Sequence, residues 1–125
     1  MDKRVKYRYK KEIKVMTKKH IQSPEERIRQ LRHEIMGHSI LYYRLDISLV
    51  DDYKFDAWCR ELKVLQDAYP QISKEVVLHD IFQDWNGKTS QCHTLPYEEF
   101  RFPTSWIRNY IMKNDIPATG LESYL

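Results

Sequence analysis

Two helical patterns joined by a short link limit most strongly what this chain can fold into. The first begins at Ser23, a good helix cap, followed by Pro24 and by two glutamates that favour the positive end of the helix dipole. Glu26, three residues after the serine, completes a capping-box pattern. Positions three and four apart then form one face of a helix that runs to about Leu45, namely Ile28, Leu31, Ile35, His38 and Tyr42.

The second pattern begins after the link. Ser48 or Asp51 can cap it, with Asp52 in its first turn. Pro70 ends it, because the residue before a proline is pushed out of the helical region. The expected buried stripe consists of Phe55, Trp58, Leu62, Leu65 and Tyr69. A short link between two helices predicts an antiparallel hairpin, here over residues 23–70.

The remainder of the chain predicts two further helices and a long loop. One helix is expected over residues 73–85, closed by Asn86-Gly87, with a strand at the β-branched Val76-Val77 as the alternative. Residues 88–104 carry two prolines and little periodicity, which predicts a loop, and residues 105–114 predict a short last helix. The predicted fold is therefore mainly α, a small helical domain built on the antiparallel hairpin.

Positive charge is concentrated at the N-terminus. Residues 1–20 hold nine Lys or Arg against two acids, a net charge of +7, whereas the whole chain of 125 residues carries +3. We expect this basic arm, a single helical domain at 21–116 and a C-terminal tail at 117–125. Alternation at 3–16 predicts a strand or small hairpin in the arm, with an extended or helical arm as alternatives. The arm can bind polyanions or serve as a solvated tail; the candidate contacts are Lys3, Arg4, Lys6, Arg8, Lys10 and Lys11.

Several kinds of site are not predicted. His33 and His38 lie five residues apart, about 140° around a helix, whereas a zinc-protease helix needs its two histidines on one face. Cys92-His93 has no acyl-transfer signature beside it, so we interpret it as an inert surface or packing element. The two cysteines give no disulfide framework, which predicts reduced thiols in a cytoplasmic protein. No apolar run reaches the roughly 20 residues of a membrane span, so no membrane association is expected.

One group of residues at the turn of the hairpin has the composition of a small-molecule site. Asp52, Phe55 and Asp56 lie at i, i+3 and i+4 and share a helix face, close to Tyr42 and Tyr43 at the end of the preceding helix. Aromatic faces can hold a flat or cationic ring, and carboxylates can accept hydrogen bonds from ribose hydroxyls or an amide. The alternative is that the aromatics belong to the core and the aspartates cap a helix.

The same residues carry a resemblance to a known family. From Ile28 to Pro70 the chain resembles the small N-terminal (Ia) domain of bacterial NAD-dependent DNA ligases, whose pattern is L-x-x-L-…-Y-Y/H-x-x-D-…-D-x-x-Y-D-x-L-x-x-E-L-…-P. The matching residues are Leu31, Tyr42, Tyr43, Asp46, Asp52, Phe55, Asp56, Arg60-Glu61-Leu62 and Tyr69-Pro70. Gly87-Lys88-Thr89 with Leu95-Pro96 is similar to an element of stand-alone, ligase-related proteins common in phage genomes.

The resemblance implies a ligand and its contacts. In those ligases the domain binds the nicotinamide mononucleotide (NMN) half of NAD. Tyr42 and Phe55 are therefore expected at the nicotinamide, and Asp52 and Asp56 at its polar groups and ribose.

Two departures from the family pattern affect this site. Phe55 stands where tyrosine is usual, so the ring face is kept and a hydroxyl is lost. Tyr43 stands where a histidine is common, which leaves the phosphate contact open. The replacement cations to consider are Arg44 and the cluster of Arg27, Arg29 and Arg32.

Three functional hypotheses follow. The first is a non-catalytic module that binds NMN or NAD in the cytoplasm, or in the host cytoplasm if the chain is phage-encoded. No catalytic residue is predicted, because the Lys-x-Asp-Gly adenylation motif of the ligases does not occur in the sequence, and no metal ligand is predicted because of the histidine spacing. The second is a module that contacts nucleic acid or a separate protein through the basic arm, with a vestigial pocket. The third is an enzyme that cleaves NAD or NMN.

Overall fold

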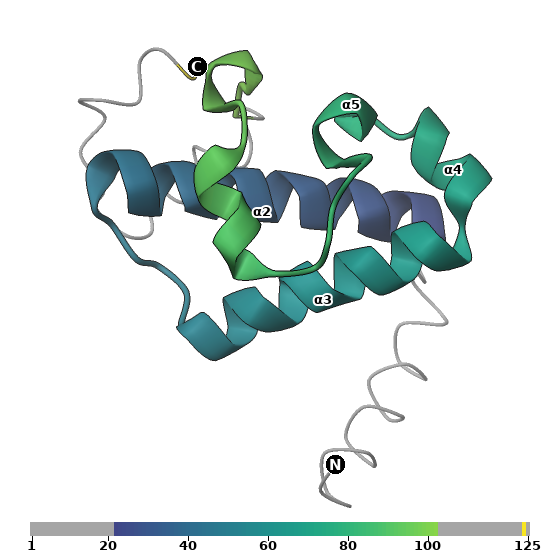
Figure 1. Cartoon of the computed structure of the whole chain (residues 1–125), viewed down its shortest axis with the longest axis horizontal. Helices are drawn as coiled ribbons and strands as arrows, with labels where there is room; N and C mark the ends of the chain where they lie inside the picture. Colours follow the sequence, from purple (N-terminus) through teal and green to yellow (C-terminus); the bar gives the residue numbers. More distant parts are fainter. Residues whose placement is uncertain (1–21, 103–123, 125) are drawn as a thin grey trace, which may run out of the picture.

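The computed structural model describes residues 22–102 and residue 124. Its elements, in chain order, are the α-helices α2 (Pro24–Leu45), α3 (Asp52–Ala68), α4 (Pro70–Glu75) and α5 (His79–Phe82), then the 3-10 helices η1 (Thr89–Thr94) and η2 (Tyr97–Glu99) (Figure 1). This part of the chain contains helices and no strand, so the mainly-α prediction is confirmed. No helix in these ranges is long and apolar enough to cross a membrane. The predictions for the arm at 1–20, for the helix at 105–114 and for most of the tail at 117–125 lie outside the described residues.

The first helix, α2, begins and ends where its sequence predicts. Ser23 is the N-cap, and its hydroxyl accepts a hydrogen bond from the Glu26 amide at 3.2 Å. At the other end Asp46 is left-handed (φ 56°, ψ 39°), a conformation that aspartate tolerates better than most residues, and its amide donates to the Leu41 carbonyl. Tyr42 is 53% exposed, whereas the other residues of the predicted face are buried, namely Ile28, Leu31, Ile35 and His38.

Helix α3 lies beside α2 and runs in the opposite direction, joined to it by residues 46–51 (Figure 1). Asp51 rather than Ser48 is its N-cap, with a carboxylate that accepts a hydrogen bond from the Lys54 amide at 2.7 Å. The helix ends at Ala68, before Pro70, as predicted.

The buried stripe of α3 differs from the prediction at two positions. Cys59 joins Leu62 as a fully buried residue of this helix. Tyr69 is 40% exposed because, as the residue before Pro70, it has left the helix (φ −129°, ψ 63°). The other predicted positions are partly buried and pack on the core, namely Phe55, Trp58 and Leu65.

The predicted helix over residues 73–85 is wrong as a single element. The structure divides this region between α4 and α5, with Val76 extended and Leu78 left-handed between them. Ser73, the expected cap, lies inside α4. The break follows from Arg32 of α2, whose guanidinium donates to carbonyl groups that a continuous helix would use internally. Those carbonyls belong to Ser73, Val76 and Val77.

The segment predicted as a loop, residues 88–104, is irregular but supplies part of the core through residue 102. It contains η1 and η2, and η1 packs against both α2 and α3. Its buried side chains are Cys92, Leu95, Tyr97, Phe100 and Phe102. Tyr124, from the predicted tail, accepts a hydrogen bond at its carbonyl from the Phe102 amide at 2.8 Å. The segment therefore covers the hairpin and reaches the place where α2 ends.

Candidate functional site

A cavity of about 430 Å³ opens where α2 ends and α3 begins. Its volume falls within the roughly 300–1,000 Å³ of small-molecule sites. All five residues predicted for such a site line it: Tyr42, Tyr43, Asp52, Phe55 and Asp56. The remaining lining residues come from the base of the cavity, from the link and from η1, and are His38, Ser39, Ile47, Ser48, Leu49, Val50 and Thr89.

The link between the helices forms one wall of this cavity. The Ile47 amide donates to the Leu41 carbonyl at 2.9 Å and so turns the chain back over the end of α2. The Ser48 hydroxyl donates to the Val50 carbonyl at 3.1 Å. Ile47 and Leu49 pack against the core, which holds the wall in place.

The two tyrosines face solvent rather than the core. Tyr42 is 53% and Tyr43 is 45% exposed, and their rings meet edge to face with centroids 4.9 Å apart. Phe55 is partly buried, with its ring edge-on to Trp58 at 6.4 Å. The alternative interpretation, in which these aromatics are core residues, is therefore wrong for both tyrosines and right in part for Phe55.

The two carboxylates are accessible hydrogen-bond acceptors. Because Asp51 caps α3, the exposed carboxylate of Asp52 is not used as the cap, contrary to the alternative interpretation. Asp56 forms an ion pair with Arg60 one turn later, at 3.0 Å. Both partners of that pair are well exposed, so solvent screens their attraction. Both aspartates can accept hydrogen bonds from a ligand.

Two buried residues of α2 form the base of the cavity, and sequence analysis did not assign them to it. His38 is 4% exposed, and its Nε2 lies 3.2 Å from the Glu34 carboxylate. Ser39 is 1% exposed, and its hydroxyl has no hydrogen-bond partner in the described structure. The available sequence signal was their spacing, since each lies four residues before one of the tyrosines and so shares its helix face.

The downstream wall is placed by a turn at Gly87. Its φ of +83° is a conformation that glycine adopts without strain, and a Cβ here would lie only 3.0 Å from the Lys63 Cβ of α3. The close approach brings η1 against the hairpin and puts Thr89 at the cavity. The sequence motif Gly87-Lys88-Thr89 does not by itself predict a place in the site.

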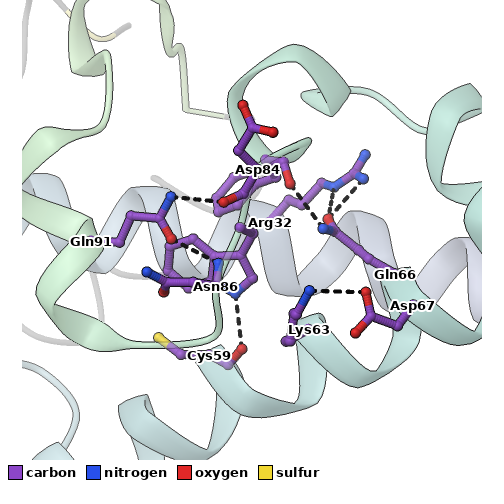
Figure 2. Close-up of polar contacts among 10 residues, drawn as sticks. Arg32, Cys59, Lys63, Gln66, Asp67, Asp84, Asn86 and Gln91 are labelled. Atoms are coloured by element: carbon purple, nitrogen blue, oxygen red, sulfur yellow. Dashed lines mark hydrogen bonds and ion pairs between the residues drawn. The ribbon is translucent and has the colours of Figure 1, made fainter.

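Hydrogen bonds fix this turn on α3 (Figure 2). The indole of Trp85 donates to the Cys59 carbonyl at 2.9 Å. Gln91 spans the turn, because its side chain donates to the Asp84 carbonyl at 3.1 Å and accepts from the Asn86 amide at 2.9 Å (Figure 2). The position of η1 is therefore determined by contacts from several directions.

The downstream segment also packs on the second tyrosine. The Tyr43 ring stacks on the Tyr97 ring with centroids 6.4 Å apart, and burial raises the pKa of Tyr43. The Arg44 guanidinium lies over the same Tyr97 ring at 5.4 Å and 3.5 Å from Glu98. Arg44 is exposed, so a cation remains available next to Tyr43.

The other cations considered for a phosphate contact differ in availability. Arg32 is fully buried, so it is not accessible for the phosphate contact considered for its cluster. Arg27 forms a two-pronged ion pair with Glu61, with both contacts at 2.6 Å. Arg29 remains exposed on α2.

The histidines and cysteines make other contacts. His33 Nδ1 lies 2.8 Å from the Arg29 carbonyl, and residues 22–102 with 124 hold no group of three His, Cys, Asp or Glu able to bind a metal. Cys59 and Cys92 are buried free thiols, whereas His93 is exposed. The pKa of Cys59 is raised well above its usual range by its hydrogen bond with Cys92 and by burial, which opposes thiolate chemistry at this residue.

Fold and cavity together define a small helical domain with an aromatic and acidic pocket at the turn of a hairpin. Residues 21–75 match the family model described as "DNA ligase-like, N-terminal NAD+-binding domain". The resemblance drawn from the sequence is therefore confirmed for this part of the chain. Of the described residues that line the cavity, Thr89 alone lies beyond the matched range.

Curated relatives agree with the family match. A DNA ligase of Christiangramia forsetii is 30% identical over 100 residues, which are 80% of this chain and 14% of the ligase. A DNA ligase of Thermoanaerobacter sp. (strain X514) is 43% identical over 49 residues, or 39% of this chain and 7% of the ligase. A DNA ligase of Pseudomonas aeruginosa is 43% identical over 51 residues, covering 41% of this chain and 6% of the ligase. The chain thus spans about a seventh or less of these relatives, and no solved structure gives a significant match.

Proposed function

We propose that this chain binds a nicotinamide nucleotide, NMN or NAD, in the cavity between α2 and α3. The main observation in support of the proposal is that three aromatic rings and two carboxylates line one cavity of about 430 Å³. The similarity of residues 21–75 to an NAD+-binding domain names the ligand class.

The chemistry of the lining suits such a ligand. A nicotinamide ring in its nucleotide is a flat cation, so it is attracted both to the faces of Tyr42 and Phe55 and to nearby carboxylates. Asp52 and Asp56 can accept hydrogen bonds from ribose hydroxyls. Arg44, exposed next to Tyr43, is the cation that we assign to the phosphate.

The proposed role is binding without catalysis. The ligase relatives adenylate themselves through a Lys-x-Asp-Gly motif, which this sequence does not contain. The described part of the cavity lining also contains no lysine. We place this binding in a reducing cytoplasm, in keeping with the two free thiols.

Calorimetric titration with NMN and with NAD tests the proposal. The double variant Asp52→Asn with Asp56→Asn keeps the shape of both side chains and removes their charge. We expect it to weaken binding at least about tenfold, or 1.4 kcal/mol, because hydrogen bonds to charged groups are the stronger ones.

A matched control removes two exposed carboxylates away from the cavity, Asp67→Asn with Asp84→Asn, and should bind as the wild type does. Absence of binding by the wild type at about 1 mM of either nucleotide would refute the proposed function. Equal affinity of the two double variants would remove the carboxylates from the site.

The basic arm supports a second candidate, an interaction with nucleic acid or with a separate protein. Its basis is the net charge of +7 within residues 1–20. DNA binding through this arm should weaken steeply as salt rises and should disappear when residues 1–20 are removed. A DNA affinity that does not depend on salt, or no DNA affinity, argues against binding of nucleic acid.

A third candidate, cleavage of NAD or NMN, is checked by incubating either nucleotide with the protein and looking for free nicotinamide.

A further inference from the structure

The buried hydroxyl of Ser39 is a polar group that has no hydrogen-bond partner among the described residues. It lies on α2 three and four residues before Tyr42 and Tyr43, on the face that lines the cavity. The residue is 1% exposed, and its Oγ makes no hydrogen bond within the described structure. A serine inside a helix often donates back to a carbonyl of the preceding turn, and Ser39 does not do so.

Neighbouring polar groups do not satisfy this hydroxyl. The Cys92 thiol and the Tyr97 hydroxyl are close to it, but neither meets the geometry of a hydrogen bond with Ser39. The Tyr97 hydroxyl instead donates to the Cys92 carbonyl. A buried polar group left in this way costs stability unless another partner satisfies it, and the cavity is where such a partner can lie.

The charges around the cavity restrict what that partner can be. Among the residues that the structure describes, the lining contains the carboxylates of Asp52 and Asp56 and no Lys or Arg. An anionic group entering beside these aspartates would be repelled, whereas a cationic ring with a neutral polar substituent would be attracted. A primary amide fits, because it offers both a donor and an acceptor to a hydroxyl.

We propose, on the basis of the nucleotide-binding function proposed above, that Ser39 hydrogen-bonds the carboxamide of the ligand. The pocket then selects nicotinamide nucleotides over the corresponding nicotinic acid nucleotides. A carboxylate in place of the amide would lack the donor and would add a negative charge to an acidic cavity. Ser39 is in this way a specificity-determining residue of the site.

The test compares two ligands and three proteins by calorimetry. The ligands are NMN and nicotinic acid mononucleotide, and the proteins are the wild type, Ser39→Ala, and Ser90→Ala as a matched exposed control. We expect the wild type to bind NMN at least about tenfold more tightly than the acid, and Ser39→Ala to bind NMN about tenfold more weakly than the wild type. Ser90→Ala should bind both ligands as the wild type does.

Thermal unfolding without ligand separates this role from a structural one. Removing a hydroxyl that has no partner should leave the melting temperature of Ser39→Ala unchanged or raised. A lowered melting temperature would show that the hydroxyl is already satisfied within the protein or by a bound water, and would overturn the inference.

The binding results distinguish the two proposals. Wild-type binding of NMN that Ser39→Ala retains in full, or equal wild-type affinity for the acid, overturns the role of Ser39 and leaves the proposed function standing. Failure of the wild type to bind either nucleotide refutes both.

Discussion

Replacing Arg32 by methionine should destabilise the protein strongly, although the residue lies outside the cavity. Arg32 is fully buried, and its guanidinium has six hydrogen bonds of 2.7–3.1 Å. Two go to the side-chain oxygen of Gln66. The side-chain nitrogen of Gln66 in turn donates to the Phe82 carbonyl at 2.9 Å (Figure 2). The others go to carbonyls at the end of α4 and to the Ser73 hydroxyl. One side chain of α2 therefore holds α3, α4 and the break before α5 together.

The size of the effect follows from the acceptors left behind. Three of the six hydrogen bonds are fully buried, those to the Val76 carbonyl and to the carbonyl and hydroxyl of Ser73. At about 1–1.5 kcal/mol net for each, the loss of these three hydrogen bonds costs about 3–4.5 kcal/mol. The pKa of Arg32 is lowered to about 10 by burial, so the wild type holds a charged group away from water. Replacing the arginine recovers part of that desolvation cost, so the expected net loss of stability is about 3 kcal/mol.

Urea unfolding followed by circular dichroism measures this difference. With a slope of about 1.2 kcal/mol/M, a loss of about 3 kcal/mol lowers the midpoint by about 2.5 M. The control Arg29→Met removes an exposed arginine from the same helix and should change stability by less than about 0.5 kcal/mol. If the free energy of unfolding of Arg32→Met lies within about 1 kcal/mol of the wild-type value, the hydrogen-bond network of Arg32 does not hold these elements together as described.

Three further predictions concern the segments around the cavity. Gly87→Ala should cost about 1–2 kcal/mol in urea unfolding, because alanine is strained at a φ of +83° and its Cβ would press on Lys63; an unchanged midpoint would contradict the described turn. Burial raises the pKa of Tyr97, so the folded state holds the phenol proton more firmly than the unfolded state does. The resulting contribution to the free energy of unfolding is fully present below about pH 10 and is lost as the pH rises further. Tyr97→Phe should therefore lose less stability than the wild type between about pH 9 and pH 11, and an equal loss would assign the effect elsewhere. Asp51→Ala should cost about 1 kcal/mol through the lost cap of α3, whereas Asp52→Ala should cost clearly less, and thermal unfolding of the two would reveal the reverse order if Asp52 were the cap.

The sequence by itself determined the features that local chemistry encodes. Ser23 starts α2 and Asp51 was one of two candidate caps for α3, because a capping side chain acts on amides two or three residues away. Pro70 marked the end of α3 because proline restricts the residue directly before it. The position of Asp52 and Asp56 on one face, four residues apart, likewise depends only on helix geometry. For these reasons the hairpin could be predicted without coordinates, and the five lining residues could be predicted from their chemistry together with the resemblance to the ligase domain.

Only the tertiary structure decided what depends on residues far apart in the chain. The helix expected over 73–85 breaks because Arg32, more than 40 residues earlier, takes its carbonyls. In residues 88–102 the apolar residues follow no regular spacing, because short 3-10 helices alternate with extended links. The sequence therefore does not indicate which of these side chains are buried. Thr89 reaches the cavity only because η1 packs against α2 and α3. Local patterns fix where helices begin and which face is apolar, whereas the partners of buried polar groups are set by packing.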